Sequence, residues 1–114
     1  MTLPLYDPKK RKPLEKDIER KIVQYAKTLG CRCYKFTSPA HRSVPDRIIL
    51  TPHGVVGFLE VKRPGGKPTE AQAHEMQSMA DKNAMVVWAD SFEKAKQFID
   101  VLMQQRIVDD RLLA

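Results

Sequence analysis

The sequence lacks most of the features that mark a disulfide-rich, membrane or zinc-binding protein. Its 114 residues include two cysteines, and no apolar run is long enough to cross a bilayer. Because the N-terminus lacks the apolar core of a signal peptide, we expect a cytoplasmic protein with no membrane partner. Cys31 and Cys33 are badly spaced for a bridge and have no second cysteine pair to complete a zinc site, so both are predicted to be buried free thiols. The histidines, His41, His53 and His74, have no ligand-like spacing.

What the chain has in excess is positive charge. It carries 20 Lys and Arg against 14 Asp and Glu, a formal charge of +6, and its 42% apolar content is typical of a globular domain. This balance favours an anionic partner, of which nucleic acid is the commonest large one. Residues 1–13 hold three prolines and the run Lys9–Lys12, which predicts a basic N-terminal arm before one domain over 14–114.

Hydrophobic periodicity and turn residues predict helices and strands in mixed order, an α/β fold with helices flanking a mixed sheet. Thr69 and Ser91 are predicted to cap the second and third helices. Tyr25, Tyr34 and Phe36 lie in apolar segments, and Trp88 lies in a fully apolar strand, so all four are predicted to be core residues. The expected elements are a helix over 14–30, strands over 31–37, 46–51 and 55–62, a helix over 70–82, a strand over 84–89 and a final helix after Ser91.

The middle strands carry charges only at their ends. If Pro52, His53 and Gly54 form a three-residue turn with Gly54 in the left-handed conformation, Thr51 pairs with Val55. Residue numbers of paired positions then keep a constant sum, which places Asp46 directly opposite Glu60 at a Cβ separation of about 5 Å.

Side chains alternate along a strand, so Lys62 shares the face of Glu60. Two opposed carboxylates repel each other unless a cation lies between them, and Mg²⁺ is commonly held by one or two carboxylates together with waters and a substrate phosphate. A helical wheel aims Glu15 closer to the apolar stripe of the first helix than Glu19, although either acid remains a candidate third member of the site.

These residues resemble the signature of the PD-(D/E)xK nuclease superfamily. Pro45 and Asp46 are separated from Glu60-Val61-Lys62 by 13 residues, and the family's core has the αβββαβ order predicted above. The segments EKDIE, KFTSPAHRSVPDRIIL, FLEVKRPGGKPTEAQ and VVWADSFEKA resemble the VRR-NUC group more narrowly. The resemblance extends from about Glu15 to Phe98 and implies a restriction-endonuclease-like fold, similar to that of Holliday-junction resolvases.

The resemblance also implies a specific role for each site residue. Asp46 and Glu60 would bind Mg²⁺ or Mn²⁺ with the Val61 carbonyl, and Lys62 would position the attacking water. Gln72 matches a glutamine of the family. Glu15 matches the family's leading acid, whereas Glu19 has the acid spacing of archaeal resolvases. Five basic residues near the site are candidates for contacts with the phosphate backbone, which position DNA without reading its sequence: Lys35, Arg42, Arg47, Arg63 and Lys67.

The predicted function is that of a metal-dependent, structure-specific endodeoxyribonuclease that acts on DNA at four-way junctions. A symmetric junction needs two cuts about a two-fold axis, and small stand-alone members of the group resemble phage and bacterial proteins that act as homodimers. Two alternatives stay open. One is a basic nucleic-acid-binding module whose acids are structural, and the other is a nuclease of the same fold that acts on flaps, single strands or duplex DNA.

Overall fold

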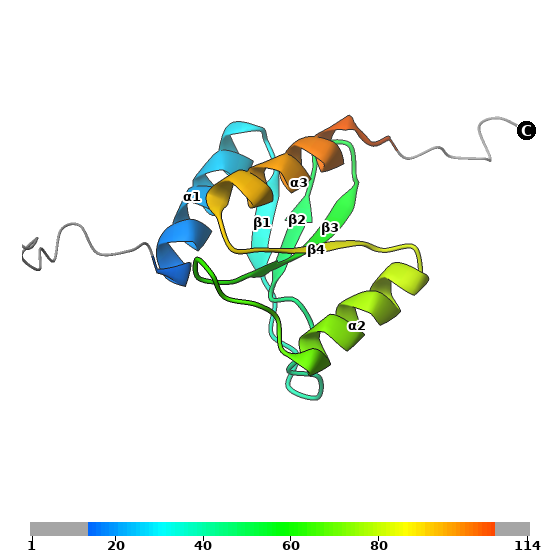
Figure 1. Cartoon of the computed structure of the whole chain (residues 1–114). Coiled ribbons are helices and arrows are strands. Elements are labelled where there is room, and N and C mark those ends of the chain that lie inside the picture. The colour runs from blue at the N-terminus through cyan, green and yellow to red at the C-terminus, as the bar shows by residue number, and fades with distance from the viewer. Residues whose placement is uncertain (1–13, 107–114) are drawn as a thin grey trace, which may run out of the picture.

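The computed structural model describes residues 14–106, so the predicted arm over 1–13 lies outside the described residues (Figure 1). Within that range no helix is long and apolar enough to cross a membrane. The predicted order of elements is confirmed: α1 (Glu15–Thr28), β1 (Arg32–Lys35), β2 (Arg47–Leu50), β3 (Val56–Val61), α2 (Glu70–Asp81), β4 (Met85–Ala89) and α3 (Phe92–Gln104).

The four strands form one mixed sheet in the order β1-β2-β3-β4. The β1/β2 and β2/β3 pairs are antiparallel, and β3/β4 is parallel. The predicted turn between β2 and β3 is confirmed, because Thr51 N–H donates to the Val55 carbonyl at 2.9 Å and Gly54 has φ of 84°. The predicted register is confirmed as well, since Arg47 pairs with Leu59 and Leu50 with Val56.

This register sorts the sheet residues into two faces by odd and even number. The odd-numbered positions form the core face, where Ile49, Leu59, Val61 and Ala89 are fully buried in the hydrophobic core together with residues of α1 and α3. The even-numbered positions form the open face. There α2 packs against β4 at one side of the sheet, and Met76 is its only buried residue. Figure 1 shows α1 and α3 on one side of the strands and α2 on the other.

Helix α3 lies very close to the core face because β3 has a glycine beneath it. A Cβ on Gly57 would lie 2.5 Å from Leu102 Cδ1 and 2.9 Å from Phe98 Cζ, so any larger residue would push the helix away. The predicted apolar stripe of α3 is confirmed by the burial of Ala95, Phe98, Ile99 and Leu102. The close packing holds β3, and thus Glu60 at its end, in a fixed position.

Three of the four aromatic residues assigned to the core from the sequence are exposed. Tyr34 is 50% exposed, Phe36 38% and Trp88 37%. All three are even-numbered positions on the open face, outside the core that the odd-numbered positions form with α1 and α3, so the core assignment was wrong for them. Tyr25 of α1 is half-buried, packs edge-on against Phe92 at a centroid distance of 5.8 Å and donates its hydroxyl to Asp100. The cysteines are free, with Cys31 buried and Cys33 half-buried.

Candidate active site

The two central carboxylates face each other at the end of β3. Asp46 precedes β2 by one residue, and its carbonyl accepts a 2.7 Å hydrogen bond from Phe36 N–H, so the ladder with β1 continues to this position. Continued by one residue, the β2/β3 register pairs Asp46 with Glu60. Burial raises the pKa of Glu60, and the Asp46 charge raises it further. Burial also raises the pKa of Asp46, with a further contribution from Glu19. The ionised form of each acid is therefore less stable here than it would be in water.

One oxygen of this pair has no partner. Asp46 Oδ1 is a buried side-chain atom that makes no hydrogen bond to any described residue. A buried polar atom left unpaired typically costs about 1–3 kcal/mol. An unpaired carboxylate oxygen beside a second buried carboxylate is the arrangement that a bound cation would relieve.

One oxygen of Glu60 is contacted by a charged ammonium group and by a neutral amide N–H donor. Lys62 Nζ lies 3.4 Å from Glu60 Oε1, and Gln72 Nε2 donates to the same oxygen at 3.0 Å. Gln72 also completes the start of α2: its Oε1 accepts from Thr69 N–H at 2.9 Å, and its own N–H donates to Thr69 Oγ1 at 3.1 Å. The capping box of α2 thus orients the side chain that fixes Glu60.

The two candidate acids of α1 have different surroundings. Glu19 is paired with Arg47, Oε1 to Nε at 3.3 Å, and both side chains are largely buried, 16% and 14% exposed. Glu15 is exposed and has no hydrogen bond or ion pair with another described residue. Its pKa is raised by burial and by Glu19, lowered by Lys62 and raised by Asp46, so its charge is close enough to interact with the proposed site.

The five candidate phosphate-binding residues separate into two groups. Lys35 and Arg42 are exposed and line a cavity of about 310 Å³ together with Asp46. Arg63 and Lys67 are exposed in the loop that follows β3. Arg47 differs, because its side chain is largely buried against Glu19 on the core face and does not extend toward solvent.

Comparisons with known proteins agree with the fold, although no family model matches the chain. A protein titled "Putative nuclease p44", from Acyrthosiphon pisum secondary endosymbiont phage 1, is 44% identical over 61 residues, which are 54% of this chain and 66% of that protein. A solved VRR_NUC domain matches with a TM-score of 0.69 and 25% identity over 75% of this chain and 94% of that one. The chain has the VRR-NUC fold. The family resemblance read from the sequence is thereby confirmed, and both similarities support a nuclease family.

The VRR-NUC fold brings Asp46, Glu60 and Lys62 to one place, and their donor set suits a hard divalent cation. Among residues 14–106 no three His, Cys, Asp or Glu side chains form a group able to hold a metal ion. Mg²⁺, however, needs only one or two protein carboxylates when waters and substrate phosphates complete its octahedron. The unpartnered Asp46 Oδ1 opposite Glu60 fits that requirement. The Val61 side chain is fully buried on the core face, so only its backbone could take part.

Sequence reasoning missed two aromatic residues beside the site. The row of paired positions at this end of the sheet runs Phe36, Asp46, Glu60, Trp88, one residue from each strand or its extension. Two acids in the middle are therefore flanked by two exposed aromatic side chains. The available signal was that Phe36 and Trp88 each lie near the C-terminal end of a predicted strand.

Proposed function

We propose that this domain hydrolyses phosphodiester bonds within DNA strands in the presence of Mg²⁺ or Mn²⁺. The observation that carries the proposal is the acid pair formed by half-buried Asp46 and buried Glu60, in which Asp46 Oδ1 has no partner among the described residues and Lys62 lies next to Glu60. A structural pair would be satisfied by neighbouring donors, as Glu19 is by Arg47. The acid pair retains a binding capacity that the fold itself does not use.

Asp46 and Glu60 would hold the cation with the Val61 carbonyl, and Glu15 would be a further ligand that reaches it through a bound water. When bound, a divalent cation supplies positive charge that offsets the negative charge developing on the phosphate during attack. Burial raises the pKa of both acids, and a nearby positive charge would favour their ionised forms. Glu15 is the better third acid because it is uncommitted, whereas Glu19 is paired with Arg47.

Lys62 and Gln72 complete the chemistry around these acids. The Lys62 ammonium donates to the oxygen of the attacking water and orients it toward the phosphorus, from a position that its contact with Glu60 fixes. Gln72 holds Glu60 in one rotamer through Nε2 while its Oε1 is occupied by Thr69 N–H. Glu19 affects the site indirectly, because it pairs with Arg47, the residue that follows Asp46 in the chain.

The DNA backbone would lie across the end of the sheet on exposed cations. Lys35 and Arg42 border the cavity that contains Asp46, and Arg63 and Lys67 follow Lys62 in the loop before α2. These contacts position a strand without reading its bases. Arg47 is better placed to support the Asp46 backbone than to reach a phosphate, because Glu19 already occupies its guanidinium.

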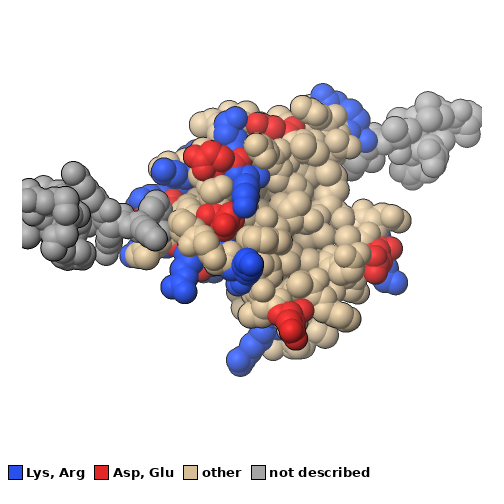
Figure 2. Space-filling model, viewed as in Figure 1, with Lys and Arg blue, Asp and Glu red and all other residues tan. Residues whose placement is uncertain are grey.

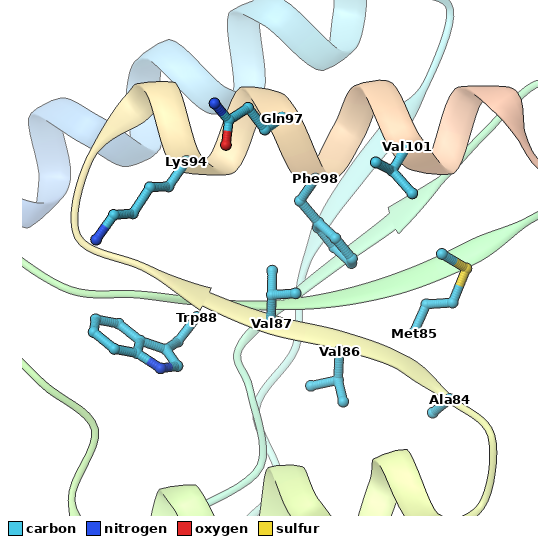
Figure 3. A pocket seen from close by; sticks show the side chains of 9 residues that line it. All are labelled: Ala84, Met85, Val86, Val87, Trp88, Lys94, Gln97, Phe98 and Val101. Atoms are coloured by element: carbon cyan, nitrogen blue, oxygen red, sulfur yellow. The ribbon is translucent and has the colours of Figure 1, made fainter.

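The preferred substrate that we propose is branched DNA, with the four-way junction as the leading case, cut by a homodimer. Two symmetric cuts require two sites about a two-fold axis. One surface suited to such a contact is the Val101 end of the groove between β4 and α3, where the apolar side chains of Met85 and Val101 lie away from Trp88 (Figure 3). Figure 2 shows a broad uncharged area across the middle of this side of the molecule.

The test is a cleavage assay with Mg²⁺ or Mn²⁺ on labelled four-way junctions, flaps, duplexes and single strands of matched sequence. We expect internal cuts with either ion and none in EDTA, with the junction cut fastest. Binding without cutting under any divalent ion would instead establish a nucleic-acid-binding module with structural acids. Fastest cutting of a flap or single strand would retain the nuclease and replace the junction as its substrate.

A further inference from the structure

The acid pair is flanked by exposed aromatic residues in the same register row. Glu60 pairs with Trp88 across the parallel β3/β4 ladder, and Asp46 pairs with Phe36 across the extension of β1 and β2. Neighbouring strands are about 4.8 Å apart, so each aromatic Cα lies about 5 Å from the Cα of an acid. Paired positions share a face, which puts both rings on the open face with the two carboxylates.

Trp88 is accessible because β4 is the edge strand of the described sheet. Its indole lines two cavities, one of about 560 Å³ toward α3 and one of about 230 Å³ toward α2. Lys94 Nζ lies 5.6 Å from the ring centroid, within the range of a cation–π contact. Figure 3 shows Lys94 reaching from α3 toward the indole at the end of the groove away from Val101.

Phe36 has a similar setting on the other side of the acids. It lines the cavity of about 310 Å³ that also contains Asp46, Lys35 and Arg42. Each aromatic side chain is thus exposed, close to one acid and accompanied by at least one cation. A purely apolar protein partner would have to bury the charges of Lys35 and Arg42 and the Lys94–Asp90 ion pair away from water, whereas a nucleotide offers a base for the ring and a phosphate for the cation.

We propose that Phe36 and Trp88 are stacking platforms for unpaired bases on the two sides of the scissile phosphate. The proposal rests on the nuclease function proposed above and narrows its substrate. Bases inside a duplex are already stacked on each other, so the strand that is cut must present splayed or single-stranded nucleotides at the acid pair. Flaps, single strands and opened branch points qualify, and a continuous duplex does not.

Trp88 is the only tryptophan of the chain, so its emission reports on its own environment. We would titrate the full-length protein in EDTA with a thymidine oligonucleotide and with a closed hairpin duplex of equal length, following binding by anisotropy. We expect saturable quenching by the single strand and little change when the duplex binds. Bound single strand without quenching would overturn the proposal, as would emission that shifts with protein concentration before DNA is added, because a second copy would then cover Trp88.

Substitution tests the same point independently. Since stacking on an aromatic side chain contributes about 1–3 kcal/mol per base, Trp88→Leu and Phe36→Leu should each weaken single-strand affinity at least about 5-fold, and duplex affinity less than about 2-fold. Trp88→Phe should retain most of the affinity, which guards against a simple folding defect. The matched control is Tyr34→Leu, an exposed aromatic of the same face two positions before Phe36. An equal loss in the control would indicate general apolar contact and contradict the assignment.

The two proposals can fail separately. If no DNA is cut in Mg²⁺ or Mn²⁺, the nuclease proposal fails, while quenching and the affinity ratios still decide the stacking proposal. If DNA is cut but Trp88→Leu leaves the ratio of flap to duplex cleavage unchanged, the nuclease stands and the stacking platforms are refuted.

Discussion

The two faces of the sheet are built from alternate residues of the same strands, yet they differ in how completely their groups are satisfied. On the core face, Ile49, Leu59 and Val61 are fully buried beneath α1 and α3, and Glu19 pairs with the opposite charge of Arg47. On the open face, aromatic rings remain exposed, two acids oppose each other and Asp46 Oδ1 has no partner in the described structure.

The contrast is sharpest at two consecutive residues. Asp46 extends to the open face and meets Glu60, whereas Arg47 extends to the core face and meets Glu19. Opposite charges at contact distance offset each other's loss of hydration, whereas the charge of Asp46 raises the pKa of Glu60 and makes its ionised form less stable. The charges of Glu19 and Arg47 are therefore balanced within the core face, whereas the open face leaves an acid oxygen without a partner among the described residues. Changes on the two faces should separate activity from stability.

The largest expected effect is the loss of turnover in Lys62→Ala. Removal of the ammonium next to Glu60 should lower the single-turnover cleavage rate by about 100- to 1000-fold, because Lys62 orients the attacking water. The melting temperature and the DNA affinity in EDTA should change little. Lys67→Ala, at an exposed position of the following loop, is the control and should weaken binding without slowing the chemical step. Comparable cleavage by Lys62→Ala would contradict its assigned role.

A smaller effect distinguishes the two members of the α2 capping box. Gln72→Ala removes both a cap contact and the 3.0 Å hydrogen bond to Glu60, so we expect a loss of stability together with a 10- to 100-fold loss of activity. Thr69→Ala removes only cap contacts and should cost about 1 kcal/mol with near-normal activity. Paired thermal melts and cleavage rates measure the difference. Equal activity in the two variants would show that Gln72 serves the helix alone.

The acids of α1 provide the next comparison. Glu19→Gln should lower stability by about 1–2 kcal/mol, because Arg47 would lose its charged partner in a largely buried place. Glu15→Gln should leave stability unchanged and raise the Mg²⁺ concentration needed for half-maximal cleavage, by roughly 10-fold for the loss of one charged ligand. Denaturant melts and Mg²⁺ titrations of both variants decide the matter. A shifted Mg²⁺ requirement in Glu19→Gln alone would make Glu19 the third acid.

The sequence was sufficient for the features that depend on local spacing. Turn length alone predicted the β2/β3 register and hence the meeting of Asp46 with Glu60, because a three-residue turn with a left-handed glycine allows one pairing. Alternation then placed Lys62 beside Glu60, as their 3.4 Å contact confirms. Resemblance supplied Gln72, whose contact with Glu60 depends on where α2 begins.

Features that depend on how the helices pack over the sheet could not be predicted from the sequence. Trp88 and Tyr34 are residue types that are often buried in a core. They are exposed because α2 covers only part of the open face. The pairing of Arg47 with Glu19 could not be predicted, because the position of Glu19 relative to β2 depends on the packing of α1. The wheel favoured Glu15 over Glu19 by a small angle, and it could not show that Glu19 would be taken by an arginine.

The smallest effect that we predict is the change in melting temperature caused by Asp46→Asn, which should be positive without metal and negative with it. Burial raises the pKa of Asp46, so the stability linked to this group is present below its ordinary pKa and is lost as the pH rises through its folded value. At neutral pH the metal-free protein therefore carries a cost that Asp46→Asn removes. The melting temperature of the variant in EDTA should rise by a few degrees, corresponding to about 1 kcal/mol, and the gain should disappear near pH 4.

Saturating Mg²⁺ should invert this order, because the wild type would gain binding energy that the variant lacks. Thermal melts of both proteins at pH 7 and about pH 4, with EDTA or Mg²⁺, measure all four combinations. The control is Asp90→Asn, since Asp90 is paired with Lys94 at 2.8 Å and its pKa is lowered rather than raised. A clear drop in the metal-free stability of Asp46→Asn would mean that Asp46 is structural, because removing a carboxylate that stabilises the fold lowers the free energy of unfolding.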